Sequence, residues 1–126
     1  MKNELSNEPQ AKTNTDIGKK GELLAANFLA EKGYEMINKN YRSGRAEIDL
    51  IAKKDNLLIF VEVKFRKNVL FGFPEGFVDK GKETRIKTVA ENYIFEKNWQ
   101  SDIRFDIISI VDKNGKIQIE HFEDCF

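Results

Sequence analysis

Hydrophobic residues recur along the chain with two different periods, and the change of period predicts where helices and strands lie. Helical spacing comes first, between Ile17 and Leu29, and Gly33 is a stop signal for that helix. Helical spacing returns over residues 82–98. These two stretches predict two amphipathic helices. Their recurring positions are Ile17, Gly21, Leu24, Ala25, Phe28 and Leu29 in the first and Ile86, Val89, Ala90, Tyr93 and Ile94 in the second.

The remaining segments have the composition of strands. Residues 34–41 alternate weakly, and residues 46–66 read as a hairpin whose second half is apolar and β-branched. Residues 103–111 and 116–122 follow the second helix and are joined by a tight Asn114-Gly115 turn. The predicted order of elements is therefore α-β-β-β-α-β-β.

Length and composition restrict the class of protein. The chain has 126 residues, and we expect a disordered polar lead-in over residues 1–13 and a single domain over residues 14–126. The first sixteen residues lack the apolar stretch of a signal peptide, and no apolar run is long enough to span a membrane. We therefore expect a cytoplasmic protein.

Charge and the reactive side chains exclude several classes of site. Lys plus Arg and Asp plus Glu are each 21, so net charge alone does not indicate a nucleic-acid-binding protein. Cys125 is the one cysteine and His121 the one histidine, which argues against a disulfide framework, a Cys- or His-based metal site and a His-centred triad. We expect both to be incidental. Arg104 and Asp106 share one strand face and are expected to form a structural pair.

Charged residues interrupt the apolar hairpin. Residues two apart in a strand point to the same face, so Glu62 and Lys64 emerge side by side, and Glu47 and Asp49 do so on the preceding strand. Burying such charges costs free energy unless something compensates them. The edge-strand alternative, with solvated charges and cross-strand ion pairs, is disfavoured by the apolar residues 60–63.

The connection between the two strands sets their register. A two-residue Asp55-Asn56 turn places Asp49 opposite Glu62 and Glu47 opposite Lys64. A four-residue loop over residues 53–56 would instead place Glu47 opposite Glu62. In either register, acidic groups converge on one patch.

Opposed carboxylates destabilise a sheet, and a divalent cation between them reverses the sign of that interaction. Carboxylate oxygens are the ligands that Mg²⁺ or Mn²⁺ prefers. Asp49 and Glu62 are the candidate ligands, and Lys64 could position water or offset negative charge. Glu22 borders the buried stripe of the first helix and could complete the site, or it could be solvated. Glu47 is either a supporting carboxylate or a surface partner of Lys64 or Arg45.

Basic and aromatic residues surround the second helix. Lys80, Lys82, Arg85 and Lys87 open it and are candidates for contact with a phosphate backbone. The preceding loop, residues 71–77, is rich in glycine and phenylalanine and suits base stacking, a lid or a homodimer surface.

An ordered set of motifs resembles the YraN-like family of bacterial proteins over residues 14–122. The set comprises Gly18-x-x-Gly21-Glu22, Gly33-Tyr34, Glu47-Ile48-Asp49-Leu50-Ile51, Phe60-Val61-Glu62-Val63-Lys64-x-Arg66, Gly72 and Arg104-Phe105-Asp106. That family resembles the PD-(D/E)XK nuclease superfamily, which includes restriction enzymes and Holliday-junction resolvases.

The resemblance implies an α/β fold with a restriction-endonuclease-like α-β-β-β-α-β core, a mixed central sheet flanked by helices, and a C-terminal hairpin. It matches Asp49 to the first acid, Glu62 and Lys64 to the (D/E)XK element, and Glu22 to an acid on the first helix. Ile48 stands where the superfamily name has proline, and Ala46 where the family usually has glycine.

Two classes of function are open at this point. The first is a metal-dependent nuclease that uses Asp49, Glu62 and Lys64 on DNA, acting on branched or flapped structures. The second is a non-catalytic nucleic-acid-binding module that keeps the nuclease fold. The clustered acids favour the nuclease, because they repel phosphate and would serve a pure binding module poorly. A scaffold that dimerises through residues 71–77 is a third, weaker alternative.

Overall fold

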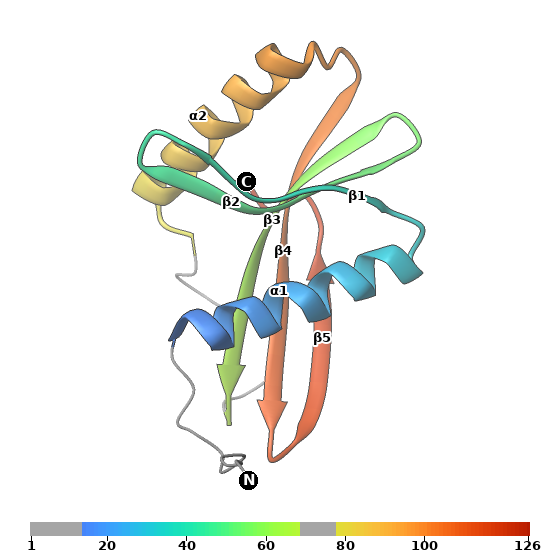
Figure 1. The fold of residues 1–126 in the computed structure, drawn as a ribbon, viewed down its shortest axis with the longest axis vertical. Helices are drawn as coiled ribbons and strands as arrows, with labels where there is room; N and C mark the ends of the chain where they lie inside the picture. The colour runs from blue at the N-terminus through green and yellow to red at the C-terminus, as the bar shows by residue number, and fades with distance from the viewer. Residues whose placement is uncertain (1–13, 69–77) are drawn as a thin grey trace, which may run out of the picture.

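A computed structural model describes residues 14–68 and 78–126, and their elements follow the predicted order (Figure 1). The expected lead-in and the aromatic loop of residues 71–77 lie outside the described residues. The elements are α1 (Asn14–Glu31), β1 (Glu35–Ser43), β2 (Ala46–Lys54), β3 (Leu57–Lys67), α2 (Lys80–Lys97), β4 (Asp102–Lys113) and β5 (Lys116–Phe122).

The strands form one mixed sheet in the order β1-β2-β3-β4-β5. Neighbouring strands are antiparallel except β3 and β4, which are parallel. A parallel pair needs a crossover connection, and α2 provides it. The chain therefore has the α/β class and the mixed, helix-flanked sheet that the sequence predicts, consistent with a restriction-endonuclease-like core.

The two helices cover opposite faces of the sheet. Alternate residues of β3 show this, since Ile59 and Val61 are in the core under α1, whereas Leu58 and Phe60 pack against α2. All four are at most 2% exposed. Burial on both faces explains why this strand is a continuous apolar run rather than an alternating one.

The β2–β3 hairpin closes as the two-residue turn predicts. Asp55 adopts a left-handed conformation with φ of 55°, and Lys54 pairs with Leu57. The ladder continues to the pair Leu50 and Val61 and stops there. Beyond that pair β2 stays paired with β1 and β3 stays paired with β4, so β2 and β3 separate. Figure 1 shows the resulting divergence, with β1 and β2 turning away from the long β3–β4–β5 arm.

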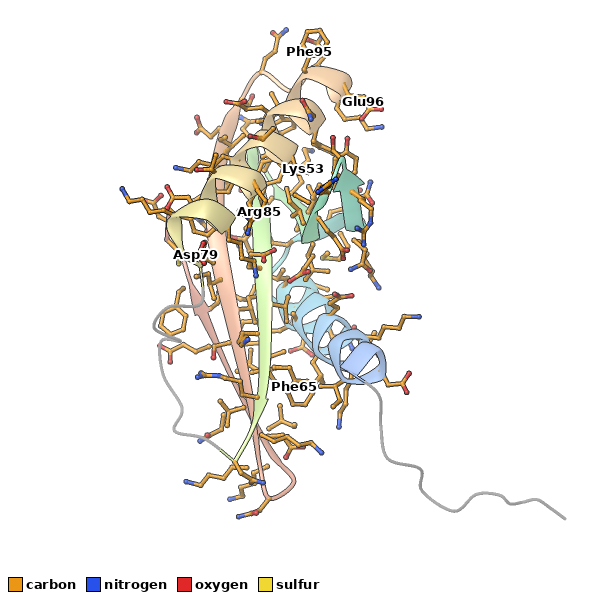
Figure 2. The ribbon with its side chains drawn as sticks, turned by 90° about the vertical axis from the view of Figure 1, so that its left-hand side faces the viewer. Lys53, Phe65, Asp79, Arg85, Phe95 and Glu96 are labelled. Atoms are coloured by element: carbon orange, nitrogen blue, oxygen red, sulfur yellow. The ribbon has the colours of Figure 1, made fainter. Side chains whose placement is uncertain are left out.

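Two elements are longer than the sequence pattern predicts. Asp79 caps α2, accepting a 2.7 Å hydrogen bond from the backbone N–H of Lys82 through Oδ1, so the helix begins at Lys80 rather than Lys82. Figure 2 shows Asp79 at this end of the helix. Strand β4 extends beyond residues 103–111 because it pairs with β3 along its length, from Asp102 to Asp112.

Candidate active site

A cleft of about 400 Å³ opens where β2 and β3 separate. It collects the predicted Asp49, Glu62 and Lys64 from the strands, Glu22 from α1 and Lys82 from α2. The cleft thus draws on both helices, although they cover opposite faces. Its other lining residues are Ile17, Gly18, Val63 and Phe65.

Asp49 occupies the position at which the ladder breaks. Its Oδ2 accepts a 2.8 Å hydrogen bond from the backbone N–H of Val63 and so takes the place of a strand partner. Burial and the nearby charge of Glu62 raise the pKa of Asp49 to about 8, and the Val63 hydrogen bond only partly opposes them. Near neutral pH this carboxyl group therefore holds its proton unless a cation arrives.

Glu62 is the most deeply placed acid of the cleft, at 3% exposure. Its Oε2 lies 3.1 Å from Nζ of Lys82. Among the described residues its Oε1 has no hydrogen-bond partner, although it is buried. Burial raises the pKa of Glu62 despite the opposing charge of Lys82. A buried carboxylate oxygen without a partner costs free energy and needs a ligand to satisfy it.

A second group of acids adjoins the first. Carboxylate oxygens of Glu22, Glu47 and Asp49 lie within 4.8 Å of one another. Asn40 joins two of them, donating from Nδ2 to Glu22 at 3.0 Å and to Glu47 at 2.6 Å. Arg42 pairs with Glu47 at 2.6 Å, so Arg42 is a surface partner of Glu47 that the sequence pattern does not predict.

Asn40 is the site-supporting residue that the sequence analysis did not single out. It has φ of 53° within β1, a left-handed conformation that asparagine tolerates better than most residues. An asparagine inside a predicted strand is a weak sign of such a backbone irregularity. Nothing in the hydrophobic pattern links it to Glu22, which is 18 residues away.

The basic residues of α2 divide into two groups. Lys82 reaches into the cleft, whereas Lys87 pairs with Glu83 at 3.1 Å. Lys80 and Arg85 are exposed, and Figure 2 shows Arg85 on α2 beyond Asp79. Lys64 also lines the cleft, with its residue exposed to solvent. Of the four basic residues predicted to contact phosphate, the structure therefore places Lys82 among the acids and the other three outside them.

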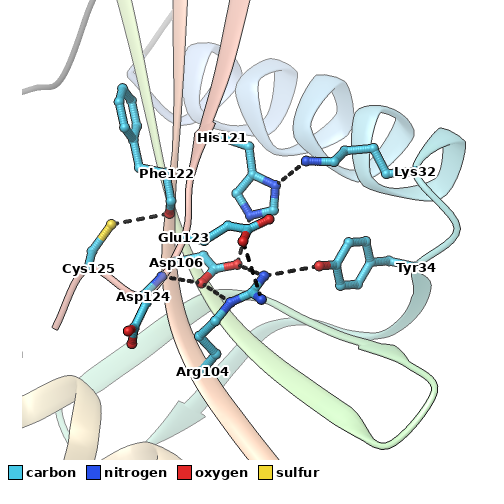
Figure 3. A network of polar contacts seen from close by, with 9 residues as sticks. All are labelled: Lys32, Tyr34, Arg104, Asp106, His121, Phe122, Glu123, Asp124 and Cys125. Atoms are coloured by element: carbon cyan, nitrogen blue, oxygen red, sulfur yellow. Dashed lines mark hydrogen bonds and ion pairs between the residues drawn. The ribbon is translucent and has the colours of Figure 1, made fainter.

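A buried polar network lies outside the cleft, at β4 and β5 (Figure 3). Arg104 donates to both oxygens of Asp106 at 2.8 Å, which confirms the expected structural pair. His121 lies 2.7 Å from Asp106 through Nε2 and 2.7 Å from Nζ of Lys32 through Nδ1. The expectation that His121 is incidental is therefore wrong. An ammonium group only donates, so Nδ1 is the acceptor and the ring proton lies on Nε2.

Comparison with known proteins decides the family. The model of the uncharacterised protein family UPF0102 matches residues 21–110, which is more than half of the chain. A UPF0102 protein of Chloroherpeton thalassium is 46% identical over 90% of this chain and 91% of its own length. Those of Dictyoglomus thermophilum and Cytophaga hutchinsonii are 48% and 50% identical, over 82% and 71% of this chain and 90% and 80% of their own lengths.

The chain belongs to the UPF0102 family. This confirms the YraN-like resemblance predicted from the motifs. The region that matches the UPF0102 model contains all five charged residues of the cleft, from Glu22 to Lys82. Among residues 14–68 and 78–126 of this UPF0102 protein, no helix is long and apolar enough to cross a membrane.

The residues present in this UPF0102 cleft fit a hard divalent cation. Oxygens of Glu22, Glu47 and Asp49 lie within 4.8 Å of one another, a spacing that one ion can bridge. Glu62 is outside that group but lines the same cleft as Glu22 and Asp49, and its Oε1 is unsatisfied among the described residues. All the candidate donors are oxygens, which suits Mg²⁺ or Mn²⁺ rather than a thiolate- or imidazole-binding metal.

Proposed function

We propose that this protein is a metal-dependent nuclease that hydrolyses phosphodiester bonds in DNA, with branched or flapped structures as substrates, and that it works in the cytoplasm. The observation that carries the proposal is Glu62. The residue is 3% exposed, and its Oε1 has no hydrogen-bond partner among the described residues. It shares a cleft with Asp49, whose pKa is raised to about 8.

Asp49, Glu62 and Glu22, which line one cleft, would hold Mg²⁺ or Mn²⁺. Glu47 lies beside Glu22 and Asp49 in an acidic group that does not include Glu62. When bound, the cation would stabilise negative charge on the phosphate and lower the pKa of the attacking water. Burial raises the pKa of both Asp49 and Glu62, so holding either carboxyl group in its charged form costs free energy. Their free-energy cost is explained if a cation offsets it.

Lys64 lies on the solvent side of the cleft, where a phosphodiester would enter. Its ammonium group would hold the attacking water in line or offset the charge that develops on the phosphate. Lys80 and Arg85 on the outer part of α2 would contact neighbouring phosphates, which fixes the strand without taking part in the reaction, whereas Lys87 is paired with Glu83.

The proposal predicts that Glu62→Gln and Lys64→Ala each reduce cleavage at least 100-fold while DNA binding stays within about threefold. Each change removes a group that acts on the transition state more than on the bound substrate. Glu62→Gln also removes repulsion toward phosphate, so binding can tighten. The assay uses labelled linear, flapped and four-way DNA with Mg²⁺, Mn²⁺ or chelator.

The matched controls are Lys67→Ala, at the exposed end of the same strand, and Glu91→Gln, on the exposed side of α2. Both should keep full cleavage. Wild-type protein that binds these substrates but cleaves none with either metal would support the non-catalytic binding module instead. Full cleavage by Lys64→Ala would show that the activity belongs to other residues or to a contaminant.

A further inference from the structure

The ion pair between Lys82 and Glu62 places a cation where the proposed function requires a metal ligand. Nζ of Lys82 lies 3.1 Å from Oε2 of Glu62. The carboxylate side chain is 4% exposed, whereas the lysine side chain is 37% exposed. The carboxylate is therefore fixed inside the cleft, and the ammonium reaches it from the solvent side.

The backbone of Lys82 is anchored while its side chain is not enclosed. Its N–H donates to Oδ1 of Asp79 at 2.7 Å, and the N–H of Glu83 donates to the Asp79 carbonyl oxygen at 2.8 Å. This cap holds the first turn of α2 against the cleft. The four-carbon stem of a lysine can swing about such an anchor and stay within reach of both the cleft and its mouth.

A divalent cation on the unsatisfied Oε1 of Glu62 would compete electrostatically with the ammonium group that holds Oε2. Both would lie within a few ångströms of the same carboxylate, where their mutual repulsion in a poorly solvated cleft is strong. The charge of Lys82 also acts on Asp49, so the competition extends to both proposed ligands.

We propose that Lys82 is an internal counter-ion that holds Glu62 in the metal-free protein, is displaced by the divalent cation, and then contacts a phosphate of the DNA. This inference rests on the proposed function, because it concerns the same cleft. It makes Lys82 a positioning residue that couples metal binding to DNA binding. By reciprocity, DNA that draws Lys82 away raises metal affinity, and the metal raises DNA affinity equally.

The test is the affinity for Mn²⁺ alone, measured by isothermal titration calorimetry on the full chain. Lys82→Gln removes the competing charge and keeps a side chain of similar length, so it should raise Mn²⁺ affinity about tenfold. Lys87→Gln is the matched control. It removes the same charge from the same helix, but Lys87 pairs with Glu83 instead of the cleft acids, so its effect should be under about threefold.

A second measurement follows the coupling itself. Wild-type protein should bind a four-way DNA junction more tightly with Mn²⁺ than without it. That enhancement should shrink in Lys82→Gln and persist in Lys87→Gln. Asp49→Asn removes a proposed ligand and should lower the Mn²⁺ affinity. That loss would show that the heat measured by calorimetry comes from Mn²⁺ binding in the cleft.

The outcomes separate the two proposals. If wild type and Lys82→Gln bind Mn²⁺ with equal affinity, the competition is overturned and the nuclease proposal stands. An equal gain in Lys82→Gln and Lys87→Gln overturns it too, because a long-range charge effect would then suffice. If neither protein binds Mn²⁺ at millimolar concentrations, even with DNA present, the metal-dependent function falls and the inference falls with it.

Discussion

The buried carboxyl groups of Asp49 and Glu62 destabilise the metal-free protein. Both have raised pKa values, and burial is the largest cause in each case. Their partners offset the cost of burial only in part. Asp49 accepts a hydrogen bond from the Val63 N–H, and Glu62 forms an ion pair with Lys82 through one of its two oxygens. A protein under selection for stability alone would place neutral residues here. The pair is better explained as stability given up for function.

We predict that Asp49→Asn stabilises the metal-free protein at pH 8, raising Tm by about 5 °C, or ~1 kcal/mol for a chain of this size. Asparagine keeps an oxygen that can accept from Val63 but carries no charge. Because the folded pKa of about 8 exceeds the usual 3.8, the folded protein binds more protons between these values. The stability contributed by protonated Asp49 is therefore lost as pH rises through this window.

Thermal unfolding in chelator between pH 5 and pH 9 measures this effect. The wild-type curve should fall toward high pH more steeply than the variant curve. Asp102→Asn, at an exposed carboxylate, should leave the wild-type slope unchanged. A variant that is no more stable than wild type at pH 8 would show that Asp49 is ionised and compensated in the metal-free protein.

At the scale of elements, the position of α1 depends on a close approach to β3. A Cβ atom built on Gly21 would lie 3.0 Å from Cβ of Phe65, tighter than ordinary packing permits. Figure 2 shows Phe65 on the strand beside α1. The next residue in the helix is Glu22, so this contact sets the distance at which Glu22 reaches the cleft.

Gly21→Ala is therefore expected to destabilise the protein by about 1–3 kcal/mol through overpacking, less the ~1 kcal/mol that alanine gains in a helix. Gly18→Ala is the control, because nothing lies within 4 Å of its added methyl group. That variant should gain about 1 kcal/mol. Urea unfolding compares the two. Equal stabilisation by both would mean that α1 does not pack closely against Phe65 at Gly21.

Comparing Gly21→Ala with Gly18→Ala also distinguishes an effect on stability from an effect on the geometry of the cleft. Gly21→Ala shifts α1 and should lower Mn²⁺ affinity by moving Glu22, even under conditions in which the variant is fully folded. Gly18 also lines the cleft, but nothing lies within 4 Å of a methyl group added there, so Gly18→Ala leaves the helix in place and should change the affinity little.

At the scale of the whole molecule, the sequence predicts what depends on local chemistry. The Asp55-Asn56 turn is a short-range signal, and it correctly fixes which residues of β2 and β3 meet. The contact of Lys82 with Glu62 and that of His121 with Lys32 join residues 20 and 89 positions apart. They depend on how α2 and β5 pack on the sheet, which no periodicity encodes. The aromatic loop of residues 71–77 lies outside the described residues, so its predicted roles remain predictions.

The buried polar network around Asp106 joins β4, β5 and the C-terminal residues to the segment between α1 and β1. Asp106 is fully buried on β4 and accepts from Arg104, from His121 of β5 and from the backbone N–H of Asp124. Arg104 also donates to the hydroxyl of Tyr34, which directly precedes β1. Through Arg104 and His121 this carboxylate connects the C-terminal strands to Tyr34 and Lys32, as Figure 3 shows.

We predict that Asp106→Asn destabilises the fold by about 3–5 kcal/mol, because it leaves the charge of Arg104 without its buried partner. Burial would raise the pKa of Asp106, but the hydrogen bonds from His121 and Arg104 outweigh it and lower the pKa below the usual 3.8. The stability of the charged form is therefore present above 3.8 and lost as pH falls through the lower folded pKa. Urea unfolding at pH 7 should show the full difference in the free energy of unfolding, and the stabilities of the two proteins should converge in strong acid.

The Mn²⁺ affinity at pH 7 should be unchanged in the folded variant, because none of these residues lines the cleft. A loss of metal affinity without a loss of stability would instead place the network in the active site.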